Sequence, residues 1–417
     1  RDTDRSRGLG DVYKRQNGRN KDMKKVAVIG LYAIKNAGDN ILCEATQYLI
    51  KQKNPEVQIV EVDVNPRIKS YKGLELIPFW ISKVLIRISG SIFKYENSSK
   101  FRYYYEYFMW WLKINRKFKT QLKDVDAIVF AGGGFLKFRT QGLNYYVEQI
   151  MKIAKKNNIP VMMNGVGIEG YSETDIRCQR LKKAINQDCF KVITTRDDID
   201  TLKNNYIVNP NTKIAHVGDP ALWVPECYNM KRNENPSNVV GINVIRGRVY
   251  QAYGNTLSEF ELLNFYKKLV QGVEERGWDW VLFSNGMAAD QKFGAMLLRA
   301  LGCSDRTKIL PTANNSVDFL EQIRSFKLVF GARLHACITS YALDVPVVGL
   351  IWSEKLRIFA DVIGKKNSYF EESELNIDNI LDAMEREMNS NYDKSIRDDL
   401  RARTKNYLEM FMDMLDN

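Results

Sequence analysis

The sequence predicts an α/β protein with two Rossmann-like, doubly wound domains that face a cleft. Three observations lead to this prediction. Short apolar runs alternate with helix-length segments through most of the chain, a polar stretch over residues 226–238 interrupts the alternation, and a second series of the same kind follows it. The length of 417 residues is too great for one ordinary core and suits two domains.

Each series consists of apolar runs that are typical of strands buried on both faces of a parallel sheet. The strand candidates of the first series are residues 25–32, 57–62, 126–131, 160–164, 190–195 and 213–217, with helix-length stretches such as 39–53 and 142–158 between them. Those of the second series are 239–245, 279–284, 327–330 and 346–351, which alternate with helices over 256–277, 288–302, 316–325 and 333–343. We therefore expect an N-terminal domain over 23–229, a C-terminal domain over 239–373, and helices over 374–417 that return to the first domain.

Composition and charge narrow the class of protein. Hydrophobic residues make up 45% of the chain and charged residues 27%, which is ordinary for a globular protein. The formal net charge of +12 favours an anionic partner. Residues 1–22 show no hydrophobic periodicity and resemble translated adaptor or vector sequence, so we expect the natural chain to start at Met23, without an export signal. The six cysteines show no C-x-x-C spacing, which predicts reduced thiols in a cytoplasmic protein rather than a zinc site or a redox motif.

An insertion over residues 68–120 interrupts the first domain and is rich in aromatic and basic residues. Eight of the eleven residues 101–111 are aromatic. One interpretation is a basic, aromatic surface that rests on the inner face of a membrane or grips a lipid-linked acceptor. The other is a helical hairpin packed on its own domain. The stretch 74–93 has the length of a membrane span, but Lys83 and Arg87 near its middle argue against one. No module motif supports nucleic-acid binding.

The chain has only two histidines, which shortens the search for a catalytic group. His216 lies inside a predicted strand and is expected to be structural. His335 lies at the turn between the strand that ends near Phe330 and the following helix, where open α/β sheets bind ligands and free N–H groups attract anions. Arg333 precedes it by two residues. A fixed cation beside a titratable imidazole fits an anionic substrate that needs proton transfer.

The run that contains these two residues, GARLHACITSYALDVPVVGL, resembles the C-terminal motif of the polysaccharide pyruvyl transferase family. Other segments resemble further motifs of that family in the same order: Gly30-Leu31-Tyr32 with Asn36-Ala37-Gly38-Asp39, Ala131-Gly132-Gly133-Gly134, Asn164-Gly165-Val166-Gly167, Thr195-Arg196-Asp197 and Gly218-Asp219-Pro220-Ala221. The resemblance extends from Met23 to about Lys365. Ala33, Asn40 and Trp352-Ser353 depart from the family pattern, and these departures bear mainly on the acceptor.

The resemblance implies a GT-B-like architecture with the active site between the domains. It implies transfer of pyruvate from phosphoenolpyruvate to a sugar of a surface polysaccharide or its precursor, with a saccharide acceptor that is free or lipid-linked. The acceptor side would include Asn36, Gly38, Asp39, Gly132, Gly133, Gly134 and Arg196. Simpler roles remain open: Asp39 as the cap of a helix that starts at residue 40, the glycines as close packing, and Arg196 as an ion pair with Asp197.

Phosphoenolpyruvate carries a carboxylate and a phosphate, so its site needs fixed cations. Arg333, Arg246 and Lys355 each follow a predicted strand of the second domain and are expected to bind the donor, with hydrogen bonds from Ser284 and Asn285. The His335 imidazolium would protonate the methylene carbon, and a sugar hydroxyl would attack C2. We expect neither a cofactor nor a metal. Two alternatives remain: a GT-B glycosyltransferase that uses a nucleotide sugar, and a non-catalytic glycan-binding subunit.

Overall fold

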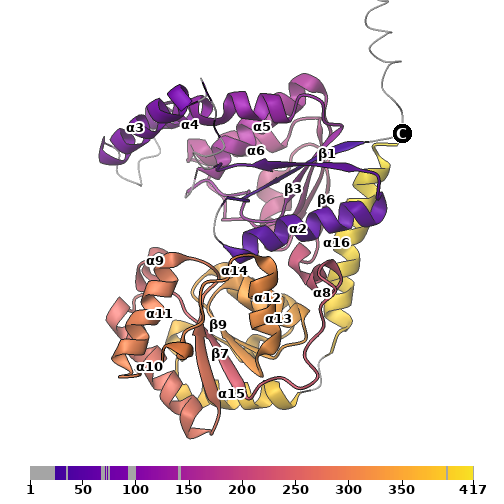
Figure 1. Cartoon of the computed structure of the whole chain (residues 1–417). Coiled ribbons are helices and arrows are strands. Elements are labelled where there is room, and N and C mark those ends of the chain that lie inside the picture. The colour runs from indigo at the N-terminus through magenta and orange to yellow at the C-terminus, as the bar shows by residue number, and fades with distance from the viewer. Residues whose placement is uncertain are drawn as a thin grey trace, which may run out of the picture.

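Two parallel sheets, each covered by helices, form two domains stacked one above the other (Figure 1). The computed structural model describes residues 24–33, 36–66, 71, 73, 76–92, 100–139, 142–390 and 393–416. The predicted leader over 1–22 and the expected start at Met23 lie outside these residues. The α/β class and the two-sheet organisation predicted from the sequence are confirmed.

The first sheet has six parallel strands in the order β2-β1-β3-β4-β5-β6. They are β1 (Lys25–Gly30), β2 (Gln58–Asp63), β3 (Ala127–Ala131), β4 (Val161–Val166), β5 (Phe190–Thr195) and β6 (Lys213–His216), with helices α2 (Ala37–Lys53), α5 (Leu143–Asn157) and α6 (Ile176–Ile185) between them. The strand order reverses next to β1, which pairs with both β2 and β3. Ligands bind at the carboxyl ends of strands at such a reversal.

The second sheet has five parallel strands in the order β11-β10-β9-β7-β8. They are β7 (Val239–Asn243), β8 (Asp279–Phe283), β9 (Leu328–Gly331), β10 (Val347–Leu350) and β11 (Tyr369–Phe370), with helices α9 (Gly247–Ala252), α10 (Glu259–Glu275), α11 (Ala288–Ala300), α12 (Ser316–Ser325), α13 (Leu334–Ala342) and α14 (Glu354–Val362). Here the order reverses next to β7, which pairs with β8 and β9. The sequence did not predict β11, which is only two residues long.

The two C-terminal helices pack on different domains. Helix α15 (Ile377–Asn389) packs against α10 and β10 of the second domain. Helix α16 (Ser395–Asp413) runs back along the first domain (Figure 1), where Leu408 and Phe411 join the buried cluster of Val26 and Val28 from β1. The predicted return to the first domain is therefore made by α16.

The insertion folds into two helices, α3 (Leu76–Ile92) and α4 (Lys100–Gln121), which extend from the end of the first domain opposite α16 (Figure 1). Helix α4 packs on α5 and α6, and α3 packs on α4. Tyr103 of α4 is buried and donates a hydrogen bond to Glu148, which also pairs with Arg180. The inner side of α4 thus belongs to its own domain. No helix in the part of the chain that is described has the length and apolarity needed to cross a membrane.

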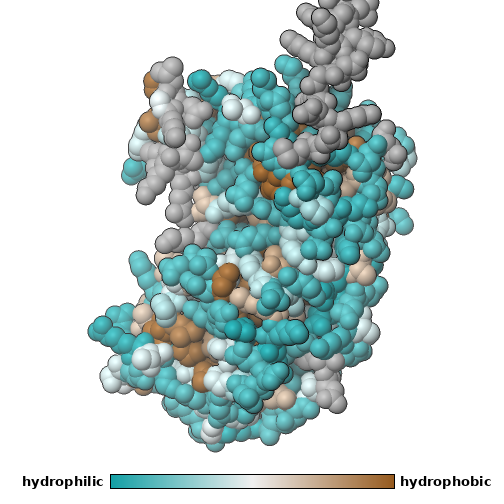
Figure 2. Space-filling view, turned by 45° about the vertical axis from the view of Figure 1, so that its right-hand side comes forward, coloured by the Kyte–Doolittle hydropathy of each residue, from teal (hydrophilic) through white to brown (hydrophobic). Residues whose placement is uncertain are grey.

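The surface seen when the side that carries α16 comes forward is mostly hydrophilic (Figure 2). Hydrophobic residues gather in a few limited areas of this view, chiefly on the second domain.

Candidate active site

The two domains meet through α2 and the short helices η4 (Pro220–Trp223) and α8 (Val224–Cys227) on one side and α12 and α13 on the other. Apolar side chains from both domains, among them Ile41, Leu222 and Ala336, form one buried cluster there. The backbone N–H of Ala37 also donates to the carbonyl of Asn285 across the boundary, over 2.9 Å. The strands of both sheets end, at their carboxyl ends, near this contact, so the candidate site lies between the domains.

His335 lies in the first turn of α13 and reaches the first domain. Its Nε2 is 3.4 Å from Nη1 of Arg196 and 3.8 Å from Oδ2 of Asp219. Burial, and the positive charges of Arg196 and Lys355, hold the pKa of His335 well below its ordinary value. The imidazole is therefore neutral at pH 7 in this state.

The imidazole packs directly against Gly38 of α2. A Cβ on Gly38 would lie 2.3 Å from Nδ1 of His335, closer than any side chain can approach. Glycine at this position is thus required by a close approach across the domain boundary.

Arg196 is held at the end of β5 by two carboxylates. It forms a buried ion pair with Asp219, and its Nε lies 3.8 Å from Asp197. Asp197 is fixed in turn by the backbone N–H of Ile168, which donates to it over 3.0 Å. The Nε of Arg196 has no hydrogen-bond partner among the described residues. A buried guanidinium with an unused donor is suited to bind an anion.

Lys355 of α14 reaches across the boundary to two glycine-rich turns of the first domain. Its Nζ would lie 3.2 Å from a Cβ on Gly134 and 3.3 Å from a Cβ on Gly167. Gly132 and Gly133 of the same turn adopt positive φ angles of 57° and 69°. Burial lowers the pKa of Lys355. The turns therefore bring the backbone close enough for an ammonium group of the second domain to rest against them.

Asp39 faces the same group of cations from α2. Burial raises its pKa to about 6, although Asn36 donates a hydrogen bond of 2.8 Å to its Oδ2 and the charges of Arg196 and Lys355 oppose the shift. Helix α2 begins at Ala37 with Asn36 as the N-cap residue, so the expectation that Asp39 caps a helix starting at residue 40 is wrong. Its side chain accepts from Asn36 and does not cap the helix.

Arg333 and Arg246 form a second cluster around the buried carboxylate of Asp290. Arg333 donates to Oδ2 of Asp290 over 2.9 and 2.5 Å, and Nη1 of Arg246 lies 3.3 Å from Oδ1. Asn243 accepts the backbone N–H of Arg333 and donates to Asn285, over 2.9 and 3.0 Å. The two arginines thus lie together at the carboxyl end of the second sheet, and their contacts are with Asp290 and not with the ring of His335.

Ser284 and His216, which the sequence analysis also singled out, make contacts that support the fold. Ser284 donates to Gln291 over 2.8 Å, so its hydroxyl supports the loop after β8. His216 ends β6, its backbone carbonyl accepts a hydrogen bond from the guanidinium of Arg403 in α16, and burial lowers the pKa of its imidazole. Among the described residues, no group of three His, Cys, Asp or Glu side chains could hold a metal ion.

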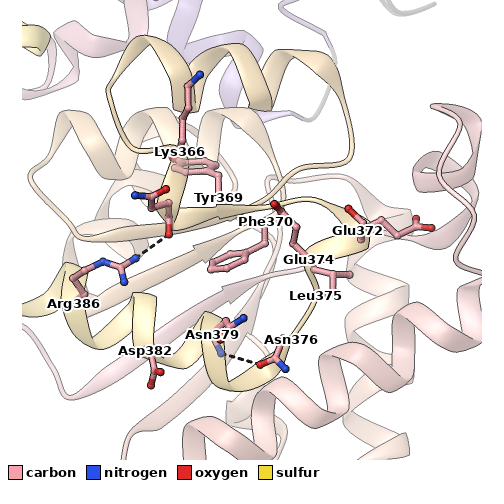
Figure 3. A pocket seen from close by; sticks show the side chains of 12 residues that line it. Lys366, Tyr369, Phe370, Glu372, Glu374, Leu375, Asn376, Asn379, Asp382 and Arg386 are labelled. Carbon is pink, nitrogen blue, oxygen red and sulfur yellow. Dashed lines mark hydrogen bonds between the residues drawn. The ribbon is translucent and has the colours of Figure 1, made fainter.

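Two pockets bear on where a ligand could bind. A narrow cavity beside Arg196, Asp219 and Lys355 has about 20 Å³, room for one water molecule. A broad, open pocket of about 910 Å³ lies elsewhere, between β11 and α15 (Figure 3). There Arg386 donates to the carbonyl of Asn367 and the side chain of Asn376 caps α15. Its lining includes the charged residues Lys366, Glu372, Glu374, Asp382 and Arg386 and no histidine.

The fold is a two-domain α/β architecture of the GT-B type. Among the solved structures that resemble the chain is UDP-GlcNAc 2-epimerase from Methanocaldococcus jannaschii, with a TM-score of 0.55 and 12% identity over 94% of this chain and 100% of that chain. UDP-GlcNAc 2-epimerase from Neisseria meningitidis gives a TM-score of 0.55 and 11% identity over 94% of this chain and 100% of that chain. A UDP-forming trehalose-phosphate synthase from Burkholderia xenovorans gives a TM-score of 0.51 and 11% identity over 95% of this chain and 99% of that chain. At these identities the likeness concerns the fold alone.

The model of the polysaccharide pyruvyl transferase family matches residues 36–354. The chain belongs to this family, as the order of its motifs predicted. A search of curated protein sequences found no match.

Two residues of the site were absent from the sequence prediction, which named Asp197 as a partner of Arg196 but neither Asp219 nor Asp290. Asp219 stands in a motif that the family resemblance used, Gly218-Asp219-Pro220-Ala221, and its acidic side chain was a signal for a second partner to Arg196. Asp290 lies in α11 without any motif, and only the fold shows that it joins Arg333 to Arg246.

Proposed function

We propose that the protein transfers the pyruvyl unit of phosphoenolpyruvate to a sugar of a surface polysaccharide or its precursor, where it forms a pyruvate ketal. The observation that carries this proposal is the imidazole of His335, 3.4 Å from the guanidinium of Arg196 at the contact between the domains. An acid group beside a fixed cation suits a donor that must be both held by its negative charges and protonated.

The donor would be held by cations from both domains. Arg196 offers a buried Nε without a hydrogen-bond partner in the described part of the chain, and Lys355 brings a positive charge from the second domain to the same place. Arg333 and Arg246 would take the second acidic group, since Asp290 neutralises only one of their two charges. Cations fixed by buried carboxylates need little reorganisation when the phosphate leaves.

His335 must gain a proton before it can give one. Its pKa is lowered by burial and by Arg196 and Lys355. A bound donor with two acidic groups would offset those two positive charges and raise the pKa of the imidazole. The protonated ring would then transfer its proton to the methylene carbon of the donor, forming a C–H bond while positive charge develops at C2.

Asp39 would take up the proton that the sugar releases. A carboxylate whose pKa is about 6 is ionised at pH 7 and is a stronger base than an ordinary aspartate. One hydroxyl attacks C2 and gives its proton to Asp39. The C–O bond to phosphate then breaks, a second hydroxyl closes the ketal ring, and its proton leaves with the phosphate. The products are the ketal and inorganic phosphate.

The domains would have to separate for the donor to enter. The cavity beside Arg196 has room for one water molecule only, whereas phosphoenolpyruvate has ten non-hydrogen atoms. The apolar contact between α2 and α13 would be the surface that opens. Closure over the donor would exclude water, which otherwise competes with the sugar for C2.

The proposal is tested by ligand stabilisation followed by turnover. Phosphoenolpyruvate should raise the melting temperature, and phosphate should be released when a panel of sugar acceptors is added. The alternative of a nucleotide-sugar transferase, to which the likeness to UDP-dependent enzymes gives some support, predicts stabilisation by UDP-sugars instead. Stabilisation by UDP-sugars but not by phosphoenolpyruvate would refute the proposal. Turnover with any acceptor would exclude a purely glycan-binding subunit.

A further inference from the structure

The outer face of α3 and α4 is an exposed hydrophobic surface. Within the described residues, fifteen large hydrophobic side chains are exposed, and nine of them lie on these two helices. They are Ile77, Trp80, Ile81, Val84 and Ile88 on α3, and Phe101, Tyr104, Phe108 and Trp111 on α4. We call these nine residues the outer face. Such a concentration exceeds the scattered apolar side chains that a protein surface ordinarily carries.

The spacing of these residues shows that each helix has one apolar side turned outward. The positions on α3 are separated by three, one, three and four residues, and those on α4 by three, four and three, the intervals of a single helix face. The buried residues of α4 lie at other positions, for example Tyr103, Ile114 and Phe118. The fold of the domain therefore uses the inner side of α4 and leaves the outer face to something else.

The segment that carries the outer face accounts for most of the net positive charge of the chain. Residues 68–120 contain eleven Lys and Arg against three Asp and Glu, a net charge of +8 within a chain whose total is +12. Lys83, Arg87 and Lys100 are exposed on the two helices. The Nζ of Lys83 lies 5.6 Å from the ring centroid of Trp80, so cationic and aromatic groups adjoin one another. The acidic Glu106 is already engaged by Arg102 and Tyr145.

We propose that the outer face docks onto a lipid bilayer with anionic headgroups. The apolar side chains would enter the boundary between headgroups and acyl chains, with Trp80 and Trp111 at the level where indole rings are favoured, and the lysines would contact phosphate. A second copy of the chain is disfavoured as the occupant, because a two-fold contact would bring two segments of charge +8 together. Docking would place the acceptor side of the enzyme at the membrane surface.

Co-sedimentation of the full chain with vesicles tests this proposal without reference to any chemistry at His335. We expect binding to vesicles that contain phosphatidylglycerol and weak binding to vesicles of phosphatidylcholine alone. The variant Trp80→Ser/Phe108→Ser should lower the partition coefficient by roughly tenfold or more, and Lys83→Glu/Lys100→Glu should remove the preference for anionic lipid. Phe260→Ser is the matched control, because Phe260 is 70% exposed on α10 of the other domain, and it should bind as the unchanged protein does.

Three results would overturn the proposal. They are no binding to anionic vesicles, equal binding by the Trp80→Ser/Phe108→Ser variant when its circular dichroism spectrum is unchanged, and a dimer in lipid-free sedimentation velocity that the same variant converts to a monomer. Quenching of tryptophan fluorescence by brominated lipid, reduced in Trp80→Phe, would support insertion of the outer face.

Discussion

Replacement of Gly38 by alanine probes the contact between the domains at its closest point. The added Cβ would lie 2.3 and 2.4 Å from two ring atoms of His335 and 2.6 Å from its Cβ, and an ordinary contact needs about 3.4 Å. Either the ring or α2 must therefore move by about 1 Å, a displacement that can cost a catalytic group about 10²-fold in rate. Overpacking of this kind also costs about 1–3 kcal/mol of stability.

The assay is a double-mutant cycle. Gly38→Ala is made in the unchanged protein and in His335→Ala, and the free energy of unfolding of all four proteins is measured in denaturant. His335→Ala removes Nδ1 and Cγ, which the new methyl group would meet at 2.3 and 2.4 Å, but keeps the Cβ at 2.6 Å. The destabilisation by Gly38→Ala should therefore be smaller in that background. Gly134→Ala is the control, since its Cβ would meet only flexible side-chain atoms, Nζ of Lys355 at 3.2 Å and Cδ of Lys137 at 3.7 Å. Equal destabilisation by Gly38→Ala in both backgrounds would refute the contact between Gly38 and the imidazole.

Two further predictions concern titration. Asp39→Asn should lower kcat by about 10²-fold with little change in the affinity for phosphoenolpyruvate, if Asp39 is the base. The same variant should also be more stable than the unchanged protein above pH 6. Burial raises the pKa of Asp39 in the folded state from 3.8 to about 6, so the unchanged protein loses at most about 3 kcal/mol of stability as the pH rises through that window. A variant that melts at the same temperature as the unchanged protein at pH 7.5 would contradict this. Binding of phosphoenolpyruvate near pH 7 should take up as much as one proton, because the donor raises the lowered pKa of His335. Calorimetry in two buffers of different ionisation enthalpy measures the number of protons taken up. Binding heats that do not depend on the buffer would exclude the uptake.

The strands could be predicted from the sequence because each is a short apolar run that ends in a turn. All ten predicted runs overlap a strand, from β1 (Lys25–Gly30) to β10 (Val347–Leu350). The two residues of β11 carry no such pattern. The insertion could be predicted as helical, and the interpretation as a hairpin packed on its own domain describes the inner side of α4, whereas the outer face is exposed.

The candidate site was predictable in its members but not in their pairing. Arg333 and His335 are two residues apart at the start of α13, and side chains at that interval on a helix do not face each other. Arg333 accordingly turns to Asp290, and His335 turns to Arg196. The latter contact joins residues 139 positions apart in different domains, and only the way the two sheets face each other brings them together. The close approach of Gly38 to the imidazole has the same origin.

The rate of ketal formation by His335→Gln tests the central claim most directly. Glutamine retains a side chain that hydrogen-bonds but cannot deliver a proton at neutral pH. With phosphoenolpyruvate and an acceptor from the panel that supports turnover, phosphate release by this variant should fall by roughly 10²–10⁴-fold while its affinity for the donor stays close to that of the unchanged protein. Release at a nearly unchanged rate, with the donor still bound, would show that the imidazole is not the acid.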